Sequence, residues 1–244
     1  MIPGMEMSRP PSPLADRVAL VSGANRGIGL AVARGIAERG ATTYLGTRDL
    51  AAGEAAAAAL RADGLAAHAV QLDVADPASI AAAVATIDAA HGRLDVLVNN
   101  AGVLADDNAR EVDPDTANRL WTINALGPWL LAAASAPLMK RNGWGRIVNV
   151  STEMASFTRM TTSAPTYRVS KVALNAVTRV LALELEGSGI LVNSLSPGWV
   201  RTDMGGPDAP RSIEQGCASI LWGVDLAADG PTGGYFQDGL PLPW

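Results

Sequence analysis

The sequence predicts an α/β fold built around a doubly wound parallel sheet, with about seven strands and helices on both faces. Short β-branched or apolar runs alternate with longer segments whose apolar residues recur at helical spacing. The short runs are apolar on both sides, which is typical of strands buried on both faces of a sheet. Strand–helix alternation of this kind gives parallel strands joined by right-handed crossovers.

Each element follows from one of these two patterns. The strands are predicted over residues 18–22, 42–46, 67–72, 96–99, 146–150 and 190–195. A seventh strand is predicted near Gly234-Tyr235-Phe236. The helices fall between the strands, over residues 28–39, 50–63, 77–90, 115–140 and 167–186.

The composition allows one sizeable core. Of the 244 residues, 48% are hydrophobic and 18% are charged, which argues against global disorder. Residues 1–13 hold four prolines and are predicted to form a disordered N-terminal extension. No linker rich in Pro, Gly or Ser divides the remainder, so residues 14–244 are predicted to form a single domain.

Charge and residue types argue against several kinds of partner. The net charge of -5 and the sequence pI of about 5.0 leave no basic face for nucleic acid. The single cysteine, Cys217, allows no internal disulfide, which fits a reducing compartment. His68 and His91 lack partners at metal-ligand spacing, so no metal site is predicted. Without a signal peptide or an apolar run of the ~20 residues that a membrane span needs, we expect a cytoplasmic protein.

The first strand ends in a glycine-rich turn, Ser22-Gly23-Ala24-Asn25-Arg26-Gly27-Ile28-Gly29. Glycines permit a tight turn and let backbone N–H groups approach a pyrophosphate, and the helix that follows adds partial positive charge. The spacing, Gly-x-x-x-Gly-x-Gly, differs from the usual Gly-x-Gly-x-x-Gly. The turn predicts a dinucleotide site, with a tight turn that binds no ligand as the alternative.

Tyr167 and Lys171 stand four residues apart at the start of a predicted helix, so their side chains share one face. An ammonium group beside a phenol favours the phenolate and lowers the pKa of tyrosine from about 10. Tyr167 is therefore a candidate proton donor to a carbonyl oxygen. Such a pair by itself is more often solvated on a surface helix, so the prediction depends on motifs elsewhere in the chain.

Five further motifs, in order along the chain, make the sequence resemble the short-chain dehydrogenase/reductase family from about residue 14 to 239. These motifs are Leu72-Asp73-Val74, Asn99-Asn100-Ala101-Gly102, Asn124, the segment 145–151 and the segment 197–202. The C-terminal residues look more like the carbonyl reductase branch. The resemblance implies a Rossmann-like dinucleotide-binding and catalytic domain. It also implies an oxidoreductase that reduces a ketone or aldehyde to an alcohol by hydride transfer.

The resemblance assigns catalytic roles to five positions. Tyr167 would protonate the carbonyl oxygen, and Lys171 would hold the nicotinamide ribose and lower the pKa of Tyr167. Asn124 would hold a water in a proton relay, with an interior helix amide as its structural alternative. The family's substrate-orienting serine falls on the second residue after the fifth strand, which here is Thr152. Its hydroxyl can donate the same hydrogen bond, with Ser151 as the alternative.

The resemblance also assigns contacts with the dinucleotide. Asp73 would contact the adenine amino group with Val74 beside the ring, and Thr202 would bind the nicotinamide carboxamide. The structural alternatives are a turn former for Asp73 and an N-cap for Thr202. Asn99 would brace the sheet. The implied cofactor-binding residues are Gly23, Asn25, Arg26, Gly27, Ile28, Gly29, Arg48, Asp73, Val74, Asn100, Ala101, Gly102, Tyr167, Lys171, Pro197, Gly198, Val200 and Thr202.

The predicted cofactor is NADP(H). A relative that prefers NAD would carry an acidic residue near Thr47, and the sequence has none there. Arg48 and Arg26 could instead clamp a 2′-phosphate, which suits the planar guanidinium group. Asp49 weakens this positive field, and NAD(H) is the alternative.

The substrate pocket is expected outside the carboxyl ends of the strands, lined by residues 103–108, 153–165 and 199–218. We expect a homodimer or homotetramer that pairs through the helices holding Asn124 and Tyr167. The alternative functions are alcohol oxidation with NAD in vivo and a catalytically silent NADP-binding sensor. A small hydrophobic carbonyl substrate is suggested by the apolar side chains Met154, Phe157, Met160, Trp199 and Met204.

Overall fold

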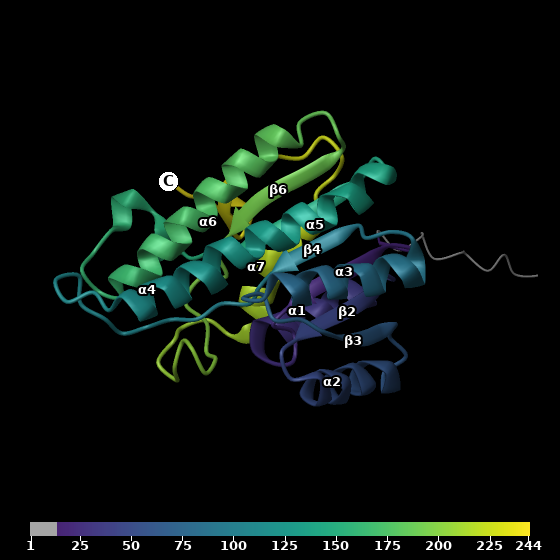
Figure 1. Cartoon of the computed structure of the whole chain (residues 1–244), viewed down its shortest axis with the longest axis horizontal. Helices are drawn as coiled ribbons and strands as arrows, with labels where there is room; N and C mark the ends of the chain where they lie inside the picture. The colour runs from purple at the N-terminus through teal and green to yellow at the C-terminus, as the bar shows by residue number, and fades with distance from the viewer. Residues whose placement is uncertain (1–13) are drawn as a thin grey trace, which may run out of the picture.

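The computed structural model describes residues 14–244, and the predicted disordered extension lies outside the described residues. One sheet has the strand order β3-β2-β1-β4-β5-β6-β7-β8, and every neighbouring pair is parallel except β7 with β8 (Figure 1). The predicted doubly wound α/β fold is confirmed. The strands are β1 (Val18–Ser22), β2 (Thr42–Thr47), β3 (Ala67–Gln71), β4 (Val96–Asn99), β5 (Gly145–Val150), β6 (Ile190–Leu195), β7 (Tyr235–Gln237) and β8 (Leu240–Pro241).

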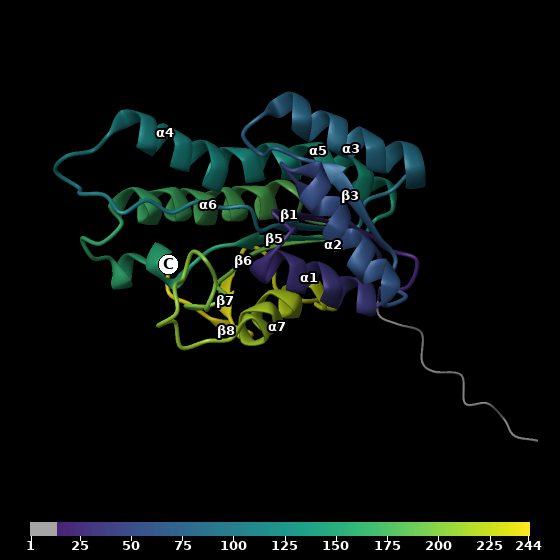
Figure 2. The ribbon, with the colours of Figure 1, turned by 90° about the horizontal axis from the view of Figure 1, so that it is seen from below.

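Helices cover both faces of this sheet, as Figure 2 shows. One face packs against α1 (Gly27–Glu38), α2 (Leu50–Ala62) and α7 (Ile213–Val224). The other face packs against α3 (Pro77–His91), α5 (Gly127–Arg141) and α6 (Pro165–Glu184). The short helix α4 (Pro114–Trp121) contacts α6.

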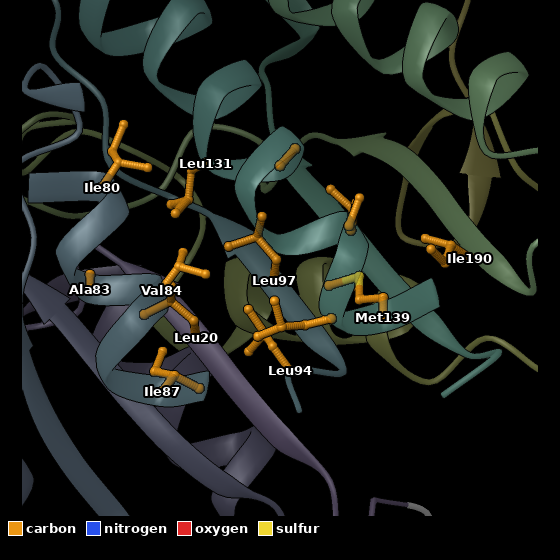
Figure 3. Packing of buried hydrophobic residues seen from close by; sticks show 14 of the residues in the cluster. Leu20, Ile80, Ala83, Val84, Ile87, Leu94, Leu97, Leu131, Met139 and Ile190 are labelled. Carbon is orange, nitrogen blue, oxygen red and sulfur yellow. The ribbon is translucent and has the colours of Figure 1, made fainter. Parts of the chain in front are cut away.

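Each face of the sheet has its own hydrophobic core, because side chains alternate along every strand. In β1, Leu20 belongs to the core under α3 and α5, whereas Val21 belongs to the core under α1 and α7. Figure 3 shows Leu20 and Leu97 packed near Val84 of α3 and Leu131 of α5. The burial of β1 on both sides explains why its sequence is apolar throughout.

The strand order reverses direction between β1 and β4, and this reversal positions the functional site. The chain leaves β1 for a helix on one face and reaches β4 only after two further crossovers. The connections that follow β1 and β4 therefore diverge at their carboxyl ends. Such a crevice is where open α/β sheets bind their ligands.

The single helix predicted over residues 115–140 is interrupted, which corrects the prediction. Residues Thr122–Leu126 form a π-helical turn between α4 and α5. Pro128 has no N–H to donate to the carbonyl of Asn124 four residues earlier, and a π turn is one way for a helix to pass such a position. The irregular turn therefore contains Asn124, one of the predicted catalytic residues.

The helix α7 was not predicted, and its first residues fall within the segment 199–218 that is predicted to line the substrate pocket. Cys217, Ile220 and Leu221 are buried in the core that α7 shares with α1. A sequence signal was present, because Ser212 and Gln215 form a capping box at the start of α7. Within residues 14–244, no helix has the length and apolar character needed to cross a membrane.

Candidate active site

The turn after β1 needs glycine at defined positions. Gly23 and Gly27 have φ of +65° and +57°, a region that side chains disfavour. A Cβ atom at Gly29 would lie 2.4 Å from the carbonyl oxygen of Gly23 and from Nδ2 of Asn100. The turn can keep this shape only without side chains, which leaves its backbone accessible to a ligand.

The start of α1 carries no side-chain cap, unlike several other helices. Side chains cap α2, α3, α4 and α7 through Asp49, Asp76, Asp113 and Ser212. The N-cap of α1 is Arg26, which makes no such bond. Backbone N–H groups at this terminus are thus left to other acceptors, and an anion such as a pyrophosphate fits them.

Ser22 and Asn100 connect the turn to the segment after β4. The Oγ of Ser22 accepts hydrogen bonds from the backbone N of Asn100 and of Ala101, each at 3.0 Å. The side chain of Asn100 donates to the carbonyls of Ser22 at 3.0 Å and Gly23 at 3.1 Å. The Asn100 side chain therefore braces the turn through its Nδ2. Asn99 braces β5 as predicted, by donating to Asn149 at 2.8 Å.

Tyr167 and Lys171 lie on the buried face of α6, with 7% and 4% of their surface exposed. The Nζ of Lys171 donates to the carbonyl of Val150 at 2.8 Å and lies 6.0 Å from the centre of the Tyr167 ring. A Cβ atom at Gly102 would stand 3.5 Å from this Nζ. The pair predicted from sequence therefore meets the ends of β4 and β5.

Burial sets the pKa values of this pair. It raises the pKa of Tyr167 to about 12, and a hydrogen bond with Thr152 acts in the opposite direction because it stabilises the phenolate. Burial lowers the pKa of Lys171 to about 8. The expectation that Lys171 lowers the pKa of Tyr167 stays a prediction.

Thr152 and Ser151 point to different partners. The Ser151 hydroxyl is buried and donates to Oδ1 of Asn175 at 2.8 Å. The Thr152 side chain instead lies close enough to Tyr167 to oppose the rise in its pKa, and its Oγ1 accepts from the backbone N of Met154 at 3.3 Å. Between the two hydroxyls left open by the sequence, the one beside Tyr167 is therefore that of Thr152.

Asn124 is fully buried and all its side-chain bonds are made within the chain. It exchanges two hydrogen bonds of 2.8 Å with the backbone of Val103, and its Nδ2 also donates to Ser170 Oγ at 3.0 Å. The side chain thus fixes the segment after β4 against α6. A water relay at this position would have to use the backbone of the π-helical turn, and this role stays a prediction.

The segment after β6 returns to the glycine turn. A Cβ atom at Gly27 would lie 3.8 Å from Cγ2 of Thr202. The Thr202 hydroxyl accepts from the backbone N of Gly205 at 3.1 Å, so it caps a turn, as its structural alternative predicted. Gly198 has φ of +73°, and a Cβ atom there would collide with the side chain of Arg211. Val200 is buried and Pro197 lies against α7.

Three polar residues were predicted to contact the adenosine end of the dinucleotide cofactor. Arg26 forms an ion pair with Asp203, so its charge is partly neutralised. Arg48 is exposed and forms no ion pair within residues 14–244. Asp73 accepts from the backbone N of Ala75 at 2.9 Å and lies in a shallow cleft beside β3, where its other oxygen can reach a ligand.

The apolar residues predicted at the substrate pocket differ in burial. Met154 packs against the small cluster that contains Leu120 and Tyr167. The other four are exposed, with 69% of Phe157, 53% of Trp199, 49% of Met204 and 40% of Met160 accessible. Exposed apolar side chains can bind a hydrophobic ligand, and contact of these four residues with a substrate stays a prediction.

Two residues at the site were missed from the sequence. Arg168 is buried, and its guanidinium donates to the carbonyls of Ser163, Met154 and Arg159 at 2.7, 3.1 and 3.1 Å. It thereby ties the segment before α6 to the helix. Tyr235 donates its hydroxyl proton to the carbonyl of Thr152. The only sequence signal for Arg168 was a charged residue between two site residues.

The chain is similar to known oxidoreductases over most of its length. Residues 17–212 match the family described as short chain dehydrogenase. Carbonyl reductase [NADPH] 1 of Sus scrofa is 34% identical, with 93% of this chain and 94% of that protein covered. The mouse protein of the same name, from Mus musculus, is 32% identical over 98% of this chain and 100% of its own.

Solved structures agree with these relatives. The NADPH-bound carbonyl reductase from chicken fatty liver superposes with a TM-score of 0.87 at 27% identity, covering 95% of both chains. A gluconate 5-dehydrogenase from Burkholderia cenocepacia, in complex with NADP and tartrate, gives 0.84 at 28% identity, covering 93% of this chain and 96% of that one. The family model and these relatives cover most of the chain, and the chain therefore belongs to the short-chain dehydrogenase/reductase family of oxidoreductases.

Proposed function

We propose that the chain reduces the carbonyl group of a small hydrophobic ketone or aldehyde to an alcohol, with NADPH as the preferred hydride source. The observation that carries this proposal is the placement of Tyr167 on the buried face of α6, with Thr152 beside it and the Nζ of Lys171 6.0 Å from the centre of its ring. Two hydroxyls at one point can bind one carbonyl oxygen. The names of the pig and mouse relatives support the same reaction.

The residues divide the chemistry among them. When bound, the reduced nicotinamide supplies the hydride. Tyr167 donates its phenolic proton to the carbonyl oxygen, and Thr152 donates a second hydrogen bond to the negative charge that develops there. An ammonium group has three N–H donors, and Lys171 uses one on Val150, so the others are available to a ribose and to the phenolate.

The protonation state of Tyr167 suits the acid role that reduction requires. Because burial raises its pKa to about 12, the phenol is protonated at neutral pH. Reduction uses this protonated form as an acid, whereas alcohol oxidation needs the phenolate as a base. The alternative of alcohol oxidation with NAD would use the same residues in the reverse direction.

The preference for NADPH is assigned to Arg48 more than to Arg26. Arg48 follows β2 directly and has no acidic partner within the described part of the chain. Arg26 already pairs with Asp203, and both side chains of that pair are about three-quarters exposed, at 74% and 76%. A 2′-phosphate near the end of β2 would thus meet one uncompensated guanidinium group.

We also propose that the chain forms a homodimer, or a tetramer of two such dimers, through α5 and α6. Large apolar side chains are exposed on these helices and on α4, where they are Trp121, Trp129, Val169, Val180 and Leu183. A self-complementary apolar surface of this kind suits a twofold interface. Light scattering of the full chain would give the mass directly.

The proposal is tested by following NADPH oxidation with a panel of hydrophobic ketones and aldehydes. Turnover of at least one ketone is expected, with NADH much less effective. A catalytically silent sensor would bind NADPH without oxidising it under any of these conditions. Alcohol oxidation as the main activity would appear instead as faster reduction of NAD or NADP by the matching alcohols at neutral pH.

A further inference from the structure

Tyr235 of β7 reaches a residue of the proposed active site. Parallel pairing with β6 sets Tyr235 beside Ser194, and Figure 2 shows β7 next to β6 in the sheet. Tyr235 is buried, with 2% of its surface exposed, and its hydroxyl donates to the backbone carbonyl of Thr152. Because Thr152 follows the end of β5 at Val150, this bond joins the C-terminal part of the sheet to the loop that carries the candidate hydroxyl.

The hydrogen bonds within the turn after β5 fix its shape but not its position on the sheet. The backbone N of Ala155 donates to the carbonyl of Thr152 at 2.9 Å, and the backbone N of Met154 donates to Oγ1 of Thr152 at 3.3 Å. Both donors belong to the short helical turn Glu153–Ala155, so they would move together with it. Tyr235 is the donor to this carbonyl that comes from the sheet.

The orientation of Thr152 decides what its hydroxyl can do. Its Oγ1 already accepts from Met154, so the hydroxyl proton is left to be donated. A donated hydrogen bond is what negative charge developing on a carbonyl oxygen requires. A rotation of the backbone at Thr152 would turn this hydroxyl away from Tyr167, on whose pKa it acts.

The Tyr235 side chain is itself held between neighbours. The ring of Trp244 lies 5.5 Å from its ring, centre to centre. Asn175 of α6 accepts from the Ser151 hydroxyl at 2.8 Å and lies close enough to Tyr235 to act on its pKa. Burial raises the pKa of Tyr235, and the charge of Glu153 acts in the same direction. The phenol therefore stays protonated at neutral pH and remains a hydrogen-bond donor.

We propose that Tyr235 is a positioning residue for carbonyl reduction, because it holds the Thr152 backbone where the Thr152 hydroxyl can donate to the carbonyl oxygen of the substrate. This inference rests on the proposed function and assigns no proton transfer to Tyr235. Its proton is held by the carbonyl of Thr152, so Tyr167 remains the acid. Tyr235 therefore acts on the reaction only through Thr152.

A double-mutant cycle over Tyr235→Phe and Thr152→Val tests this role, with kcat and KM measured on one good ketone at saturating NADPH. Tyr235→Phe alone should lower kcat about tenfold with little change in KM, since a misplacement of about 1 Å can cost about 10²-fold. In the Thr152→Val background it should change kcat by no more than about twofold, because the hydroxyl that it positions is gone. Losses that multiply in the double variant would overturn the proposal, and so would an unchanged kcat in Tyr235→Phe.

Tyr44→Phe is the matched control. It also removes a buried tyrosine hydroxyl that is hydrogen-bonded, at 2.9 Å to Nε2 of His91. Tyr44 lies on β2, on the other side of β1, β4 and β5 in the sheet order, so this variant should keep the kcat of the parent.

Hydrogen–deuterium exchange gives a second readout that needs neither substrate nor turnover. The amides of Met154 and Ala155 both donate to Thr152, so their exchange, followed by mass spectrometry, reports how firmly Thr152 is held. Exchange should be faster in Tyr235→Phe than in the parent and unchanged in Tyr44→Phe. The melting temperature and the NADPH dissociation constant should show that both variants are folded.

Equal exchange in the parent and in Tyr235→Phe would overturn the positioning role, whatever the activity. A parent chain that reduces no ketone or aldehyde would instead contradict the proposed function. In that case the exchange measurement would still decide whether Tyr235 holds Thr152.

Discussion

The two sides of the active site are built in opposite ways. On the cofactor side, the turn after β1 excludes side chains, since a Cβ atom at Gly29 would lie 2.4 Å from a backbone carbonyl oxygen. On the substrate side, long cationic side chains hold the loops, as Arg168 binds three carbonyls and Arg211 forms a bidentate pair with Asp238. Substitutions that enlarge a glycine should therefore damage the cofactor side. Substitutions that shorten an arginine should damage the substrate side.

The largest effect is expected at Tyr167, where both sides meet. Tyr167→Phe keeps the ring and removes the proton donor, so kcat should fall by about 10³–10⁴, within the range for general acid catalysis. The NADPH dissociation constant, measured by fluorescence titration, should stay the same. A variant with near-normal kcat on a ketone would show that the phenol is not the acid.

Variants of Ser151 and Thr152 test which of these two neighbouring hydroxyls acts on the substrate side. Thr152→Val should lower kcat by about 10²–10³, as for the loss of one oxyanion donor, while Ser151→Ala should cost far less. Thr152→Ser keeps the donor, so it should retain activity and admit bulkier ketones. Steady-state kinetics on one good ketone with saturating NADPH separates these cases. If Ser151→Ala is the inactive variant instead, Ser151 holds the catalytic role.

Arg168 tests whether the substrate side depends on a cationic brace. Arg168→Met removes four charge-assisted hydrogen bonds, three to carbonyls and one to the Ser163 hydroxyl, and frees the segment before α6. Each such bond is worth about 1.5–3 kcal/mol. We expect the KM for the ketone to rise about 10- to 100-fold and the melting temperature to fall, with NADPH affinity nearly unchanged. Arg159→Met, an exposed arginine of the same segment, is the control and should change little. An equal loss of NADPH affinity in Arg168→Met would contradict the separation of the two sides.

The smallest expected effect concerns one charge on the cofactor side. Arg48→Asp should reduce the ratio of kcat/KM for NADPH over NADH by about tenfold or more, because a charged contact with the 2′-phosphate is lost. Arg26→Gln should change the ratio less, since Arg26 already pairs with Asp203. Comparable kcat/KM for both cofactors in the parent chain would count against an arginine contact.

The sequence was most informative where local chemistry decides the structure. The strands β1, β4 and β6 have the predicted bounds, because each is a buried apolar run between turn residues. The spacing of Tyr167 and Lys171 was sufficient to place both on one face of a helix. The glycines of the turn after β1 likewise predicted a tight turn from the sequence alone, and Gly23 and Gly27 have a positive φ.

The sequence was less informative where distant segments meet. The helix α7 contains Gly216 because a Cβ atom there would lie 2.6 Å from Val200, a contact that no local pattern shows. The burial of Arg168 depends on carbonyls of a loop that precedes it. The choice between Thr152 and Ser151 likewise needed the position of Asn175, 24 residues from Ser151.

The π-helical turn at Thr122–Leu126 makes the chain length between α4 and α5 critical. A π turn accommodates one residue more than an α-helical turn, so deleting one residue there would let the whole stretch continue as a regular α-helix. Everything before the deletion would then rotate by about 100° relative to α5. Asn124 would leave Val103 and Ser170, and α4 would turn a different face toward α6. This segment should therefore tolerate no change in length.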